Sequence, residues 1–88
     1  MNVEFRQRFE KDLESIVDPK LLTRLGSALE EVRKAKSLGA VHNLDKLSGK
    51  PSYYRIRVGD YRIGFKLAAG TAVFLRCLRR KDIYRHFP

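Results

Sequence analysis

The stretch that most constrains the fold is residues 53–67, in which apolar and charged side chains alternate in two short runs. Alternation with a period of two is the pattern of a strand with one buried face. Gly59 and Asp60 separate the runs, and a two-residue loop of this kind is typical of a tight β-hairpin with a type I′ or II′ turn. The hairpin register then pairs apolar residues with each other: Tyr54 with Phe65, Ile56 with Ile63, and Val58 with Tyr61.

The opposite face of this expected hairpin collects positive charge. The register places Arg57 directly across from Arg62, with Arg55 and Lys66 on the same face. Like charges in this position destabilise a sheet by roughly 0.2–1 kcal/mol per pair. Two interpretations remain: the cations are spread into water on a solvated face, or the face binds an anion, with a phosphodiester backbone as the leading candidate.

Charge is distributed unevenly along the 88 residues, whose formal net charge is +9. Residues 1–45 contain eight basic and eight acidic side chains, whereas residues 46–88 contain eleven basic and only two acidic ones. We therefore expect a neutral scaffold followed by a half that presents the positive field. Nucleic acid is the commonest partner of such a field, and an acidic protein segment is the next.

Hydrophobic periodicity predicts the other elements. Asp18 and Pro19 suit the N-cap and first residue of a helix, and Gly39 suits its end. The position of Arg76 stays open, because the turn before its strand could have two or three residues. In chain order we expect a strand at 2–5, helices at about 6–17 and 19–39, a loop at 40–52, strands at 53–58, 61–67 and 72–78, and a short final helix.

These elements predict one α+β domain over residues 1–88. A small, mainly antiparallel sheet of about four strands would carry a two-helix hairpin on one face and a short C-terminal helix, with the basic face turned away from the hairpin. No apolar run approaches the ~20 residues that cross a bilayer, and the N-terminal residues lack the pattern of a signal peptide. We therefore expect a soluble cytoplasmic protein without a membrane partner.

The side chains disfavour several classes of enzyme. The two histidines, the single Cys77 and the scattered acids form no metal-ligand set, no Gly-rich phosphate loop is present, and no nucleophile–His pair is apparent. His42 is expected in a loop without an acidic partner, Cys77 in the core, and no cofactor is expected. Arginine, lysine and tyrosine remain, and they suit cleavage of RNA by its own 2′-hydroxyl, in which fixed cations stabilise the charge that builds on phosphorus.

Three segments resemble the RelE/ParE superfamily of toxins from bacterial and archaeal toxin–antitoxin systems, as does the expected order of elements. They are Lys46-Leu47-Ser48-Gly49, residues 54–62 and residues 80–84. The resemblance covers essentially the whole chain. It implies a metal-independent, ribosome-dependent endoribonuclease that cuts mRNA in the ribosomal A site, and an acidic antitoxin as protein partner.

The resemblance also implies roles for five residues. Arg55 and Arg57 match two basic residues, often lysines in RelE-type toxins, that contact the scissile region. Arg62 matches an arginine that stabilises the phosphate in the transition state, Arg80 one assigned to the leaving group or to charge stabilisation, and Tyr84 a tyrosine that stacks on or orients the base. Further RNA contacts are expected from four more cations: Lys50, Lys66, Arg79 and Lys81.

Other functions remain open from the sequence. A ParE-like toxin shares the fold and poisons DNA gyrase without being an enzyme, although that branch generally lacks the basic catalytic set. A plain RNA-binding module would show salt-sensitive binding without cleavage. At the level of single residues, Arg80 could be solvated and Tyr84 could pack the end of the chain.

Overall fold

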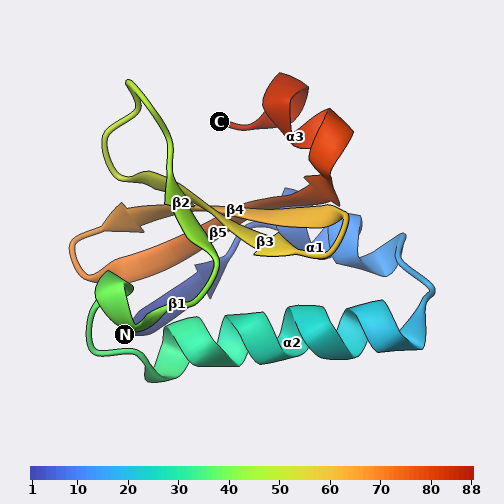
Figure 1. The fold of residues 1–88 in the computed structure, drawn as a ribbon, viewed down its shortest axis with the longest axis horizontal. Helices are drawn as coiled ribbons and strands as arrows, with labels where there is room; N and C mark the ends of the chain where they lie inside the picture. The colour runs from blue at the N-terminus through green and yellow to red at the C-terminus, as the bar shows by residue number, and fades with distance from the viewer.

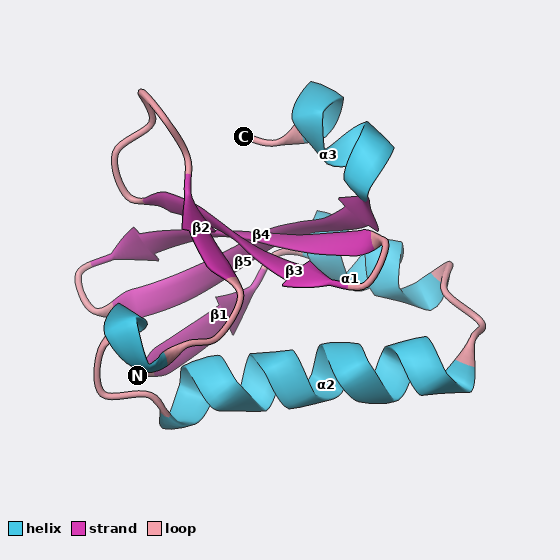
Figure 2. Cartoon of the chain, viewed as in Figure 1, coloured by secondary structure: helices cyan, strands magenta, loops and turns pink.

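A mixed five-stranded sheet lies at the centre of the computed structural model, which describes residues 1–88 (Figure 1). The strands follow the order β1-β5-β4-β3-β2; β1 is parallel to β5 and every other pair is antiparallel. Helices lie on both sides of the sheet (Figure 2). The strands are β1 (Asn2–Phe5), β2 (Leu44–Lys46), β3 (Tyr53–Val58), β4 (Tyr61–Ala68) and β5 (Thr71–Arg79).

The α+β architecture is confirmed, with five strands rather than about four. The additional strand, β2, lies in the segment expected to be a loop, which also contains a short 3-10 turn at Leu38–Ala40. Strand β2 has only three residues and forms the edge of the sheet beside β3. Asp45 and Lys46 give this segment no apolar alternation that would predict a strand. Such charged residues are common in an edge strand, which has only one strand neighbour.

The β3–β4 hairpin has the predicted register. Tyr54 pairs with Phe65, and Arg57 lies opposite Arg62. In the turn, Gly59 has a φ of 57° while Asp60 does not have a positive φ, which fits type II′ rather than type I′. The two apolar faces of the hairpin strands therefore coincide, and the basic side chains share the other face.

Two helices cover the apolar face of the sheet: α1 (Gln7–Glu14) and α2 (Pro19–Lys34). The predicted N-cap is confirmed, since the Asp18 carboxylate accepts hydrogen bonds from the backbone N–H groups of Lys20 and Leu21. The predicted end at Gly39 is wrong, because α2 stops at Lys34. The amino group of Met1 binds the carbonyl oxygens of Arg33 and Ala35 at 2.7 and 2.9 Å, so the last turn is satisfied without a glycine.

Strand β5 is buried on both faces, as its unbroken apolar run predicts. A bulge beside Gly64 and Phe65 leaves Leu75 without a partner, because Phe74 pairs with Phe65 and Arg76 pairs with Gly64. As a result, Phe74 and Cys77 both face the main core under α1 and α2, although they are three residues apart.

The third helix, α3 (Arg80–His86), lies on the side of the sheet opposite α2 (Figure 1). Ile83 and Phe87 pack with Leu47 in a second, smaller cluster. A Cβ atom at Gly64 would lie 2.8 Å from three atoms of the Phe87 ring, so the glycine permits this close approach. None of the helices is both long and apolar enough to cross a membrane.

Candidate functional site

The basic face and α3 carry all five predicted site residues, and the structure shows one contact between those of the face and those of the helix. Arg55 and Arg57 come from β3, Arg62 from β4, and Arg80 and Tyr84 from α3. The guanidinium carbon of Arg55 lies 4.9 Å from the centroid of the Tyr84 ring. Tyr84 remains 65% exposed, so its ring contacts a cation and still faces solvent. Helix α3 therefore contacts the basic face through Tyr84, in addition to packing on the sheet.

The β3–β4 turn holds two of the arginines. Arg62 donates from Nη1 to the carbonyl oxygens of Gly59 and Tyr61, at 2.8 and 2.9 Å. The backbone N–H of Arg80 donates to the carbonyl oxygen of Asp60 at 2.7 Å, so α3 begins beside the same turn. No carboxylate lies within 4 Å of the charged groups of Arg55, Arg62 or Arg80. These three guanidinium groups therefore keep donors for an external anion.

One counter-charge on this face was missed in the sequence. Asp45 pairs with Arg55 in the strand register, and its carboxylate lies 3.1 Å from Nε of Arg57. The two side chains are about half exposed, so the pair leaves the guanidinium of Arg57 accessible. A three-residue edge strand supplies this acid, which is why assigning residues 40–52 to a loop concealed it.

The four further cations do not form one group. Lys66 lies over the Tyr53 ring on the basic face, while Lys50 in the β2–β3 loop and Lys81 in α3 are exposed. Arg79 lies elsewhere: its guanidinium is 5.6 Å from the centroid of the Tyr61 ring, and Tyr61 packs on the helix side of the sheet. The structure therefore separates Arg79 from the basic face.

Arg76 does not join the basic face either. The turn before β5 has two residues, Ala69 and Gly70, and the bulge then directs Arg76 to Asp12 of α1. Two hydrogen bonds of 2.8 and 3.1 Å join the side chains, which are only 15% and 12% exposed. The same carboxylate accepts the backbone N–H of Cys77 at 2.9 Å. Asp12 thus ties α1 to β5.

Two residues outside the basic face bear on the chemistry. Burial raises the pKa of the Cys77 thiol to about 12, so this cysteine is no nucleophile near neutral pH. His42 does have an acidic partner, contrary to expectation: its Nδ1 lies 2.8 Å from Oε2 of Glu31. This hydrogen bond raises the pKa of His42 and lowers that of Glu31.

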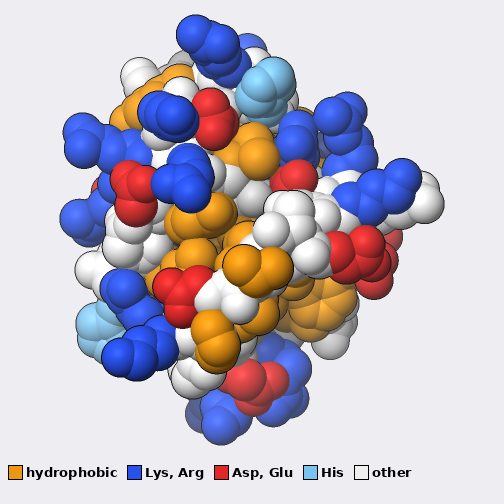
Figure 3. Space-filling view, turned by 90° about the vertical axis from the view of Figure 1, so that its right-hand side faces the viewer, with side chains coloured by type: hydrophobic (Ala, Val, Ile, Leu, Met, Phe, Trp, Pro, Cys, Tyr) orange, Lys and Arg blue, Asp and Glu red, His pale blue; other side chains and the backbone are white.

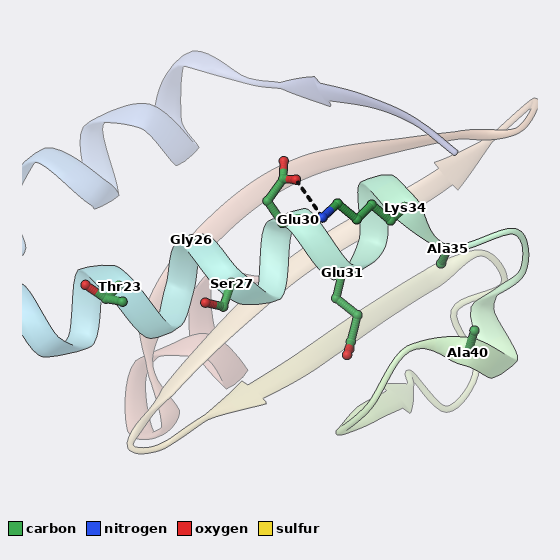
Figure 4. A pocket seen from close by; sticks show the side chains of 8 residues that line it. All are labelled: Thr23, Gly26, Ser27, Glu30, Glu31, Lys34, Ala35 and Ala40. Atoms are coloured by element: carbon green, nitrogen blue, oxygen red, sulfur yellow. Dashed lines mark ion pairs between the residues drawn. The ribbon is translucent and has the colours of Figure 1, made fainter.

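A shallow hollow on the outer side of α2 carries none of the predicted residues (Figure 4). Its wall is polar, with Lys34 3.9 Å from Glu30 across one turn of the helix. Across the whole chain, no three His, Cys, Asp or Glu side chains lie together in an arrangement that could hold a metal ion. The chemistry that the basic face can support is therefore binding of phosphate by guanidinium groups and stacking on a tyrosine.

Comparison with known proteins places this geometry in a family. The family model described as the ParE toxin of a type II toxin–antitoxin system, parDE, matches residues 3–84. Toxin RelE3 of Methanocaldococcus jannaschii is 40% identical over 89 residues, which cover 100% of both chains.

Solved structures agree with this relation. The RelB-RelE antitoxin–toxin complex from Methanococcus jannaschii contains a chain with a TM-score of 0.81 and 39% identity, covering 97% of this chain and 99% of that one. A chain of the E. coli RelBE complex has the same fold, with a TM-score of 0.70, 21% identity, and coverage of 89% and 94%. The chain therefore belongs to the RelE/ParE superfamily of toxins from type II toxin–antitoxin systems.

Proposed function

We propose that this toxin is a metal-independent endoribonuclease that cuts mRNA in the A site of the ribosome and so stops translation. The observation that supports the proposal best is the contact of Arg55 with the Tyr84 ring, 4.9 Å apart, on a sheet face and a helix that also carry Arg62 and Arg80 without carboxylate partners. A structural sheet face gains nothing from unpaired arginines, whereas phosphodiester binding requires them.

The reaction we propose is attack by a 2′-oxygen of the RNA on its own adjacent phosphorus. The new bond forms between the 2′-oxygen and phosphorus as the 2′-hydroxyl gives its proton to water. The bond to the 5′-oxygen breaks and that oxygen takes a proton from water, so the products carry a 2′,3′-cyclic phosphate and a 5′-hydroxyl. Arg55 and Arg57 would bind the scissile region, and Arg62 would stabilise the charge on the non-bridging oxygens. Arg80 would stabilise the leaving oxygen, while Tyr84 would orient the base.

None of the four arginines is a good proton acceptor, because the pKa of arginine exceeds ~12. Much of the acceleration would therefore come from fixing the geometry of the RNA. The ribosome would hold the mRNA in the required geometry, which is why we propose that cleavage depends on the ribosome.

The partner we propose is an acid-rich antitoxin that neutralises the basic half of the toxin. The charge of the chain supports this choice, since residues 46–88 carry eleven cations and two acids. The related archaeal chain is itself from a complex with RelB.

Induced expression tests the proposal, with mRNA ends mapped by primer extension. The wild type should arrest growth and produce cuts inside translated codons, whereas Arg62→Ala and Arg80→Ala should be harmless. Arg33→Ala is the matched control, because Arg33 is an exposed arginine of α2 that pairs with Glu30. Equal toxicity of all four proteins would contradict the assignment of the site.

Purified components separate the ribosome and metal requirements. The toxin should cleave the message on programmed ribosomes, whereas the same message without ribosomes should stay intact. Cleavage of ribosome-bound mRNA should persist when the toxin has first been treated with EDTA and returned to the ribosome buffer. Loss of activity after this treatment, restored by added metal, would overturn the metal-independent reaction.

A second candidate is poisoning of DNA gyrase, because the matching family model is that of ParE. It predicts toxicity with intact mRNA and stalled gyrase–DNA complexes in vitro. Arg62→Ala would then stay toxic, since the basic face would serve only to bind the antitoxin.

A further inference from the structure

A second basic surface lies beside the end of α3. It is a pocket of about 400 Å³ lined by nine residues, none of which was expected from the sequence to contact RNA. We call it the tail pocket. It brings together four parts of the chain that are far apart in sequence: residues 6–8 at the start of α1, Tyr53 of β3, Leu75 and Arg76 of β5, and residues 86–88.

The wall of the tail pocket carries positive charge. It contains Arg6, Arg8, Arg76 and His86, and no Asp or Glu. Arg8 has no carboxylate within 4 Å of its guanidinium, and Arg6 lies 3.7 Å from Glu4 in a pair of which both side chains are more than half exposed. An exposed pair of this kind is weak, so both arginines can bind another anion. Figure 3 shows Lys and Arg side chains crowded around the upper end of the molecule, the end at which α3 lies in Figure 1.

Arg76 supplies the wall with a cation that is held in place. Its Nε and Nη2 donate to Asp12 at 2.8 and 3.1 Å, and its side chain is only 15% exposed. Nη1 takes part in neither hydrogen bond, so it keeps its donors for a ligand in the pocket. A guanidinium that is already ordered loses little conformational freedom when it binds an anion.

The rest of the lining is apolar and aromatic. Tyr53, Leu75 and Phe87 line the pocket and pack in the small cluster under α3. The rings of Tyr53 and Phe87 meet edge to face, with their centroids 5.9 Å apart. A ligand that fits must therefore combine negative charge with a flat apolar group, and a nucleotide has both.

The tail pocket continues the basic face. Tyr53 lies two residues before Arg55 on the same face of β3, which is about 7 Å along the strand. Successive phosphates of a stacked strand are about 3.4 Å apart, so this distance corresponds to roughly two nucleotides. His86 likewise follows Tyr84 by two residues in α3. This continuity favours RNA over an acidic protein as the occupant, because RNA bound at Arg55 and Tyr84 can reach the pocket directly.

We propose that the tail pocket binds a nucleotide of the mRNA beside the cleavage site, with its phosphate on Arg6, Arg8 and Arg76 and its base against the apolar lining. The inference rests on the proposed function, which places the message on the basic face. It assigns the toxin a subsite that holds the message on one side of the scissile phosphate and so helps to fix its geometry. The residues of the pocket position the RNA and take no part in the bond changes.

The first test measures binding of a 2′-O-methyl oligonucleotide, which cannot be cleaved, by fluorescence anisotropy. Arg6→Ala/Arg8→Ala should weaken binding by about fivefold or more, because two phosphate contacts are lost. Lys20→Ala/Lys36→Ala is the matched control, since it removes the same charge from exposed positions outside the pocket. The control should bind with nearly the affinity of the wild type.

A series of oligonucleotides with one abasic nucleotide at each position in turn tests the apolar lining in the wild-type protein. One position outside the cleaved pair should weaken binding, and this effect should disappear in Arg6→Ala/Arg8→Ala. Equal affinity of the pocket variant and the wild type would overturn the inference, as would equal weakening in the control. Weaker antitoxin binding with unchanged RNA affinity would also overturn it and make the pocket a protein contact.

Cleavage on programmed ribosomes identifies the source of the nucleotide. A message that is abasic at the position found above should be cut more slowly by the wild type and no more slowly still by the pocket variant. Normal cleavage of that message, with loss of affinity of the variant for ribosomes without mRNA, would place ribosomal RNA in the pocket and overturn the assignment to the message. A wild type that binds the oligonucleotides as expected and cuts no message would count against the proposed nuclease and leave the subsite intact.

Discussion

Two aspartates pair with arginines that lie far from them in the sequence. Asp12 engages Arg76 under α1, and Asp45 holds Arg57 by one nitrogen on the open face. Neither pairing is visible in local sequence, because the partners are 64 and 12 residues apart. Among the four arginines of the predicted site, three have no carboxylate partner: Arg55, Arg62 and Arg80.

Replacing Asp12 should be costly to stability. Asp12→Asn removes the charge that compensates the mostly buried Arg76, and breaking a buried pair on one side costs about 3 kcal/mol. Urea denaturation should show this loss in the free energy of unfolding. Glu30→Gln, which alters the exposed pair with Arg33, should cost less than about 1 kcal/mol. Similar losses in both variants would show that Asp12 contributes no more than a surface acid.

The pair of His42 and Glu31 should make stability depend on pH. Hydrogen bonding to Glu31 raises the pKa of His42, so the stabilisation is complete below the unfolded value of about 6.5 and disappears as the pH rises through the folded value. Glu31→Gln should therefore destabilise the protein more at pH 6 than at pH 9. NMR titration should also show a lower pKa for His42 in this variant. An unchanged pKa would mean that the pair does not form in solution.

At the scale of elements, the position of α3 depends on the glycine at position 64 of β4, which has no side chain. The ring of Phe87 occupies the space that a Cβ atom at Gly64 would need, and Tyr84 reaches Arg55 from the same helix. The order of the proposed site therefore rests on how closely α3 approaches the sheet.

Gly64→Ala should displace α3 while the rest of the sheet stays folded. We expect a loss of about 1–3 kcal/mol in the free energy of unfolding, typical of overpacking, and a large loss of cleavage. Proteolysis should become faster within residues 80–88. Adding Phe87→Ala should remove the clash and restore part of the stability of Gly64→Ala. Full activity of Gly64→Ala would show that the position of α3 does not matter for cleavage.

The sequence predicted best those elements whose signals are local. Alternation gave the β3–β4 register because a two-residue turn leaves one pairing in which all apolar residues coincide, and Asp18-Pro19 marked the start of α2. The wrong predictions concern elements whose bounds are determined by contacts between residues far apart in the sequence. Strand β2 exists because β3 offers it an edge, and α2 ends early because Met1 reaches its last carbonyl groups.

The same distinction holds for the proposed site. All five of its residues could be placed on the basic face or in the final helix from period and resemblance, but the contact between Arg55 and Tyr84 could not be derived from either. The pairing of Asp45 with Arg57 was not predictable, and neither was the position of Arg79 away from the basic face. Both depend on which side of a strand faces a residue of another element.

For the whole molecule, an excess charge of +9 predicts salt-sensitive binding to RNA. Three unpaired arginines that contact three phosphates of single-stranded RNA give a slope of about −2 in a plot of log affinity against log salt. A 2′-O-methyl oligonucleotide, which cannot be cleaved, allows this measurement. Arg62→Ala should reduce the slope by about 0.7, and Arg33→Ala should leave it unchanged. Equal slopes for all proteins would place the contacts elsewhere.

The parallel pairing of β1 with β5 has a consequence for how the toxin is made. Asn2–Phe5 must wait for Thr71–Phe74, because these residues are partners in the finished sheet. A growing chain therefore lacks this edge of its sheet until Thr71–Phe74 has been made, so the first strand of the chain is among the last to find its partner.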